Sequence, residues 1–325
     1  MSGRLRGLLK SITMLKYLLS GSITLFPALA AYSQVSQPIK YKDPVFSRTM
    51  VEKDLSYSND TSARKHLRST LFDLYQPKED SMSLRPLIIW MHGGGFKFGS
   101  KEAKGVRLWC ETFASRGYVC AAINYRLGKK NLTFNFTELV KNCSRAVEDA
   151  LQAITFFKNN CARFRIDTGR IVLAGNSAGG MIALQAAYSS GAELRQLQGS
   201  SDSNLLSHSV NPGNVAAVIN FWGGIFNPGW LHNARVPIVS VHGRNDGIVP
   251  YDHKGSPLYG SLPIHLLADS LHIPNSLQTY DEYSHELQKH FNPLIISVKT
   301  KKRWLEAGQF AANFLYRELF AGNRY

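Results

Sequence analysis

The chain has little that would support a metal or redox site. Its 325 residues include only four cysteines, none of them in a Cys-x-x-Cys pair, and no histidine cluster has ligand spacing. These absences exclude the common structural zinc sites, so we expect no metal. Internal repeats, heptads and low-complexity tracts are also missing, which excludes solenoid and coiled-coil architectures.

Acidic residues are scarce. The chain has 23 Asp and Glu against 38 Lys and Arg, a net charge of +15. Such a field favours anionic surfaces, acidic polysaccharide or nucleic acid. However, no basic run is interleaved with aromatic residues, and no zinc-finger or RNA-recognition spacing occurs. We therefore expect no nucleic-acid partner.

The N-terminal segment has no acid and no long uninterrupted apolar run. Four cations precede an apolar stretch that is broken by Gly21, Ser22 and Pro27. This layout predicts a signal peptide over residues 1–33, a mature domain over 34–325, and export to the periplasm or beyond the cell. The run is short for a membrane span, so we expect no stable span after removal. An uncleaved anchor helix and a start at Met14 are the alternatives.

The four cysteines suit an exported protein with zero, one or two disulfides. Cys143 and Cys161 flank one expected helix, which would hold them about 27 Å apart at 1.5 Å per residue. That pair is therefore not expected.

Apolar strands alternate with helices along the rest of the chain. We expect strands within 46–58, 69–77, 85–96, 118–127, 171–174, 215–224, 236–243 and 276–281, and helices within 106–117, 136–160, 181–188 and 299–319. This alternation predicts an α/β fold with a mostly parallel sheet covered on both faces. Active sites of such sheets lie at the carboxyl ends of the strands.

One turn carries the strongest chemical signal. In "IVLAGNSAGG", residues 171–180, Ser177 stands between a buried strand and a helix, with glycines on both sides. A serine on so sharp a turn is held in a strained backbone with its hydroxyl exposed. The simpler interpretation is a small-residue turn that lets the strand and helix pack closely. The choice between the two interpretations depends on whether the chain supplies catalytic partners for Ser177.

Suitable partners follow other strands. His92 to Phe96 end one strand, Asp246 follows a second, and His285 follows the last. A serine hydroxyl needs an imidazole base, and that imidazole needs a carboxylate to fix its tautomer. The order Ser177, Asp246, His285 is that of α/β-hydrolases.

The segments "HGGGF", "GNSAGG", "NYRL" and "HGRNDGIVP" together resemble the α/β-hydrolase carboxylesterases, especially HGGG-type esterases and lipases and secreted bacterial carbohydrate esterases. The resemblance runs from about residue 71 to residue 285. It implies an α/β-hydrolase fold with about eight mostly parallel strands and helices on both faces. It also implies a nucleophile, acid and base in Ser177, Asp246 and His285, and oxyanion amides from Gly94, Gly95 and Ala178.

Other residues could be mistaken for the triad. Asp149 and Asp167 precede the nucleophile, so surface or capping roles are expected for them. Asp252 remains an alternative acid and His290 an alternative base. By the resemblance, His92 supports the oxyanion loop.

We expect an exported carboxylesterase without a cofactor, acting on short-chain or carbohydrate-linked esters of the acetyl or feruloyl type. We expect a small-molecule or polysaccharide-linked ester as the substrate. Short acyl chains are expected because the segment 188–214 is polar and short where a lipase would have an apolar lid. Candidate pocket residues are Phe96, Phe98, Trp222, Ile248 and Tyr283. A prolyl-oligopeptidase-type serine peptidase, a lipase and a non-catalytic binding module are the alternatives.

Overall fold

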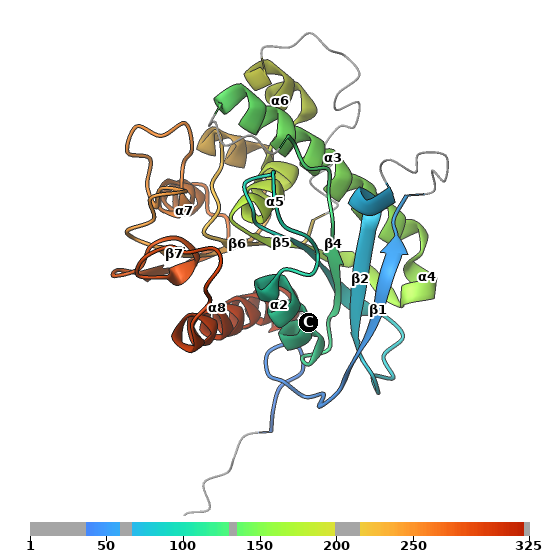
Figure 1. Ribbon diagram of the computed structural model, residues 1–325. Helices are drawn as coiled ribbons and strands as arrows, with labels where there is room; N and C mark the ends of the chain where they lie inside the picture. Colours follow the sequence, from blue (N-terminus) through green and yellow to red (C-terminus); the bar gives the residue numbers. More distant parts are fainter. Residues whose placement is uncertain (1–36, 59–66, 130–134, 199–214, 322–325) are drawn as a thin grey trace, which may run out of the picture. The chain divides into compact units, whose positions relative to one another are not determined.

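The computed structural model describes residues 37–58, 67–129, 135–198 and 215–321 (Figure 1). The description below concerns the compact unit that begins at Pro38. The predicted signal peptide, residues 1–33, lies outside the described residues. Among the helices that are described, none is long and apolar enough to cross a membrane.

The unit is built on one eight-stranded sheet with the order β1-β2-β4-β3-β5-β6-β7-β8. The strands are β1 (Thr49–Ser56), β2 (Leu71–Pro77), β3 (Arg85–Met91), β4 (Val119–Ile123), β5 (Ile166–Asn176), β6 (Ala217–Phe221), β7 (Ile238–Gly243) and β8 (Asn275–Tyr280). Only the pairs β1–β2 and β2–β4 are antiparallel. The expected strand number and mostly parallel arrangement are confirmed.

Burial explains why the central strands read as continuous apolar runs. All residues of β3, β4, β6 and β7 are buried. A strand covered on both faces has no side that requires polar side chains, and it therefore loses the alternation of a half-exposed strand.

Helices cover both faces (Figure 1). One face carries α3 (Phe136–Asn159), α5 (Ala178–Tyr188), α6 (Gly191–Gln198) and α7 (Ser261–Ser270), whose buried residues belong to one apolar cluster. The other face carries α2 (Lys104–Ala114) and α8 (Val298–Tyr316), which pack against each other. Shorter elements are η1 (Leu67–Thr70), α4 (Cys161–Phe164), η3 (Pro228–Asn233), η4 (His285–Leu287) and η5 (Arg317–Ala321).

All four cysteines are free thiols. Cys110, Cys120 and Cys143 are buried, and Cys161 is half-buried. Zero disulfides was one of the outcomes that the cysteine count allowed.

Candidate active site

The turn from β5 into α5 places Ser177 at the carboxyl edge of the sheet. Ser177 has φ 53° and ψ −120°, a conformation that non-glycine residues seldom adopt. The surrounding glycines allow close packing, because a Cβ on Gly179 would collide with the backbone of Met91 on β3. The chain therefore holds the serine under backbone strain between two closely packed elements.

Three residues far apart in the sequence meet at this edge. His285 Nε2 lies 2.9 Å from Ser177 Oγ, and His285 Nδ1 lies 2.7 Å from Asp246 Oδ2. All three are buried, with Ser177 and Asp246 each 7% exposed and His285 2% exposed. Because Nδ1 faces a carboxylate, it carries the ring proton, and Nε2 accepts a hydrogen bond from the serine hydroxyl.

Asp246 is held as a carboxylate by four donors. Its Oδ1 atom accepts the backbone N–H groups of Ile248 and Val249 at 2.8 and 3.0 Å. Its Oδ2 atom faces His285, and His242 Nε2 lies 3.3 Å from the same oxygen. Burial alone would raise the pKa of Asp246, but hydrogen bonds from His242 and His285 outweigh it and hold the pKa well below its usual value. The group is therefore ionised wherever an esterase would work.

The loop after β3 brings backbone donors to the nucleophile. A Cβ on Gly93 would lie 3.3 Å from Ser177 Cβ, so this loop packs directly on the serine. Gly94 and Gly95 have φ values of +115° and +60°, which favour glycine. Within the described chain, the amides of Gly94, Gly95 and Ala178 donate to no acceptor. These N–H groups are thus available to an oxyanion.

His92 anchors this loop. Its Nδ1 lies 2.7 Å from the carbonyl of Gly93, its own carbonyl accepts the Tyr125 hydroxyl at 2.7 Å, and its ring stacks on Tyr125. Burial lowers the pKa of His92 to about 4, so the ring is neutral near pH 7. This arrangement has the structural role that the resemblance implies.

The residues that could be mistaken for the triad lie elsewhere. Asp149 pairs with Arg126 at 2.8 Å and is buried, so the expected helix-surface role is wrong. Asp167 accepts from the Gly169 amide and pairs with Arg170. Asp252 faces Lys254 at 3.8 Å, and His290 is exposed. Neither Asp252 nor His290 contacts Ser177 or His285.

The five candidate pocket residues divide into two groups. Phe98 and Ile248 are 47% and 58% exposed, and Tyr283 is half-buried beneath the guanidinium of Arg303. Phe96 and Trp222, in contrast, are buried in the core. Phe96 packs edge-on against Tyr125, and Trp222 stacks among Trp109, Phe221 and Trp304. Both are therefore corrected to core residues, since their rings are enclosed by other aromatic side chains.

Sequence reasoning missed His242. It is fully buried at the end of β7, with Nε2 3.1 Å from the carbonyl of Val249 and Nδ1 2.8 Å from Ser261 Oγ. The signal was its position four residues before Asp246, in "VHGRND". That spacing alone does not show that a strand end and its following turn fold back on each other.

Metal ligation has no support in the described chain, where no group of three His, Cys, Asp or Glu residues could hold an ion.

Known proteins resemble this chain in sequence and in fold. Residues 72–227 match the family model described as BD-FAE. The structure superposes on a thermophilic esterase from Thermogutta terrifontis with a TM-score of 0.56 at 19% identity, covering 88% of this chain and 98% of that one. The chain has the α/β-hydrolase fold. The expected fold is thereby confirmed.

Curated proteins similar to parts of this chain are named as esterases or as a deacetylase. They include gut esterase 1 of Caenorhabditis elegans, 33% identical over 29% of this chain, and arylacetamide deacetylase of Bos taurus, 30% identical over 43%. A probable isoprenylcysteine alpha-carbonyl methylesterase of Arabidopsis thaliana is 33% identical over 53% of this chain. The matched segments span only 16%, 31% and 37% of those relatives.

Proposed function

We propose that this protein is a carboxylesterase that works through a covalent acyl-enzyme. The observation that carries the proposal is the continuous hydrogen-bonded chain from Asp246 through His285 to Ser177. The names of the relatives support the same class of reaction.

In the first half-reaction, Ser177 Oγ attacks the ester carbonyl carbon while its proton passes to His285 Nε2. The carbonyl oxygen becomes an oxyanion, which Gly94, Gly95 and Ala178 stabilise through their N–H groups; one such donor contributes about 3 to 4 kcal/mol. His285 then gives the proton to the departing alkoxide, so the alcohol leaves and the acyl group stays on Ser177.

In the second half-reaction, water attacks the acyl carbon and gives a proton to His285 Nε2. Collapse of the second oxyanion breaks the bond to Ser177 Oγ, which takes the proton back. Throughout, Asp246 holds the imidazole in the reactive tautomer and stabilises its cation. The products are a carboxylic acid and an alcohol.

Short-chain or carbohydrate-linked acyl groups, such as acetyl or feruloyl, are the proposed substrates. The polarity of the sequence after α5 supports this choice, although residues 199–214 lie outside the described chain. Tyr251, in the loop after Asp246, is buried with its ring edge-on to His242. Each methylene of a long acyl chain gains about 0.8 kcal/mol only where it is buried, so an enzyme that selects long chains needs an extended apolar pocket. We also propose that residues 1–33 direct export.

The test is hydrolysis of 4-nitrophenyl esters from acetyl to dodecanoyl, beside methyl ferulate and acetylated xylan, by the wild-type protein and Ser177→Ala. We expect activity that needs Ser177 and is greatest from acetyl to butyryl. A maximum at ten carbons or more, or a jump in rate when substrate forms an emulsion, would instead show a lipase. Cleavage of peptides but not esters would show a peptidase.

A further inference from the structure

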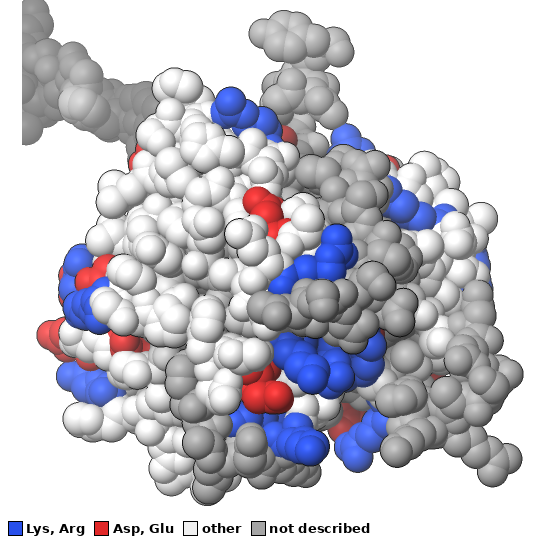
Figure 2. All heavy atoms as spheres, turned by 90° about the horizontal axis from the view of Figure 1, so that it is seen from above, with Lys and Arg blue, Asp and Glu red and all other residues white. Residues whose placement is uncertain are grey.

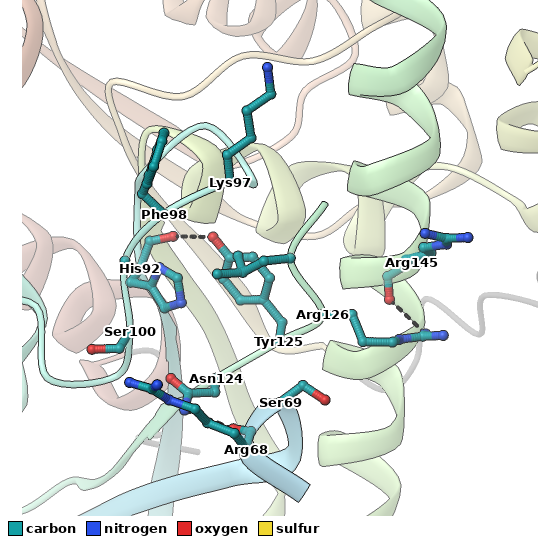
Figure 3. Close-up of a pocket in the computed structure, with 12 residues that line it drawn as sticks. Arg68, Ser69, His92, Lys97, Phe98, Ser100, Asn124, Tyr125, Arg126 and Arg145 are labelled. Carbon is teal, nitrogen blue, oxygen red and sulfur yellow. Dashed lines mark hydrogen bonds between the residues drawn. The ribbon is translucent and has the colours of Figure 1, made fainter. Parts of the chain in front are cut away.

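One cavity is lined in part by the loop that follows β3. It has a volume of about 600 Å³, within the range of ligand pockets, and lies between η1, the loop after β3, the end of β4 and α3. None of Ser177, Asp246 and His285 lines it (Figure 3). The proposed catalytic mechanism therefore leaves this cavity unexplained.

The cavity adjoins the proposed oxyanion site. His92 lines it, and the next residue, Gly93, packs on Ser177. Lys97, Phe98 and Ser100 of the same loop also line it. Because β3 and β5 are neighbours in the sheet, the loop that lines the cavity also lies against the turn at Ser177.

The cavity wall is cationic. Of its twelve lining residues, four are basic and none is acidic; the basic ones are Arg68, Lys97, Arg126 and Arg145. Glu148 and Asp149 neutralise Arg126. Within the described chain no carboxylate pairs with Arg68 or Arg145. Figure 2, which views the molecule from above, shows Lys and Arg side chains gathered right of centre.

Arg68 is the best placed of these cations. Figure 3 shows its side chain reaching from η1 toward Ser100 and Asn124, whereas the guanidinium of Arg145 points away from His92. Asn124 is buried and already bonded to the Lys101 amide and the Arg68 carbonyl, so it fixes this wall. Phe98 and Leu127 supply partly exposed apolar surface beside the polar groups.

We propose that this cavity binds a carboxylate carried on a ring, aromatic or sugar, at the remote end of the ester substrate. In this proposal Arg68 contacts the carboxylate, and the side chain of Phe98 contacts the ring. The proposal rests on the proposed esterase function and names the substrate class of that site. An arginine binds a carboxylate through two parallel N–H donors. This geometry favours a carboxylate over a neutral amide as the bound group.

The test compares matched substrates. 4-Acetoxybenzoate and 4-acetoxybenzamide share the acetyl group and ring and differ in the remote charge, and acetylated glucuronate and acetylated glucose form a second pair. We expect Arg68→Gln to lower the anionic-to-neutral ratio of kcat/KM about tenfold, the effect of losing one charged hydrogen bond. The first pair tests an aromatic carboxylate and the second a sugar acid.

Lys78→Gln is the matched control. It removes the same charge from an exposed residue at the end of β2, which is the opposite edge of the sheet. An unchanged ratio in Arg68→Gln, or an equal fall in both variants, would overturn the proposal, because an equal fall reports only the net charge.

A binding measurement separates this proposal from the esterase proposal. Titration calorimetry of Ser177→Ala with 4-hydroxybenzoate is expected to show binding that Arg68→Gln weakens about tenfold and Lys78→Gln leaves unchanged. Such binding without hydrolysis of either acetoxy ester by the wild type would reject the esterase and retain the anion site. Hydrolysis of the acetoxy esters without binding of 4-hydroxybenzoate would retain the esterase and reject the anion site.

Discussion

His242 Nε2 lies 3.3 Å from Asp246 Oδ2, the same oxygen to which His285 donates. Two acceptors face His242 Nε2, this carboxylate and the Val249 carbonyl. His242 therefore carries its ring proton on Nε2, and its Nδ1 accepts a hydrogen bond from the Ser261 hydroxyl. A buried histidine thus orients the carboxylate that orients the proposed base.

Replacing His242 should therefore affect turnover more than substrate binding. We expect His242→Leu to lower kcat about tenfold, the effect of one hydrogen bond to a charged group, with KM little changed. With one donor removed, Asp246 should hold the imidazolium of His285 more strongly, and the acidic limb of the pH profile should move to higher pH. Steady-state kinetics from pH 5 to 9 measure both. A fall in activity with an unmoved profile would indicate a purely structural role.

His285→Ala should abolish esterase activity, with a loss of about 10⁶ in kcat, because members of such a triad fail as a unit. His290→Ala is the control, since its side chain is exposed and contacts neither Ser177 nor Asp246. Rates with 4-nitrophenyl acetate compare the two. A greater loss in His290→Ala would transfer the role of base to that residue.

Asp246→Asn should leave the protein folded but slow turnover by about 10⁴, because an amide at this position favours the wrong tautomer of His285. Asp252→Asn tests the alternative acid and should retain most activity, since Asp252 faces Lys254 rather than the histidine. Circular dichroism checks folding beside the kinetics. A larger loss in Asp252→Asn would contradict the assignment.

Two buried histidines should make the fold sensitive to acid. Burial lowers the pKa of His92 and His265 to about 4, from an ordinary value of 6.5. As pH falls through 6.5 the unfolded chain binds protons that the folded chain refuses, so stability is lost between these two values. Each histidine should cost about 2 kcal/mol between pH 7 and pH 5.

Urea unfolding of the wild type and His265→Gln at the two pH values measures this cost. His265 lies on α7 and bonds to Asn275, away from Ser177. The variant should lose about 2 kcal/mol less than the wild type over that interval. Equal losses would mean that His265 does not resist protonation in the folded state.

Local patterns were enough to predict the framework and the triad geometry. Short stretches of sequence indicate the buried strands, the turn at Ser177 and the order of Asp246 and His285. The sheet topology then places these residues at one edge of the sheet. The roles of these residues in catalysis stay a prediction.

Packing between distant segments was not predictable in the same way. The burial of Trp222 depends on Trp109 and Trp304, which come from two helices on one face. Leu305 of α8 is 40% exposed although its neighbour Trp304 is buried, because the two lie about 100° apart around the helix. Periodicity gives the direction of a helix face but not the width that its neighbours cover.

The most direct test of the central claim is covalent labelling of the nucleophile. The wild-type protein is treated with paraoxon, and its peptides are analysed by mass spectrometry while residual esterase activity is followed. We predict one diethylphosphoryl group, on Ser177, in proportion to the activity lost, and no label in His285→Ala. Label on another serine, or full inactivation with Ser177 unmodified, would contradict the account.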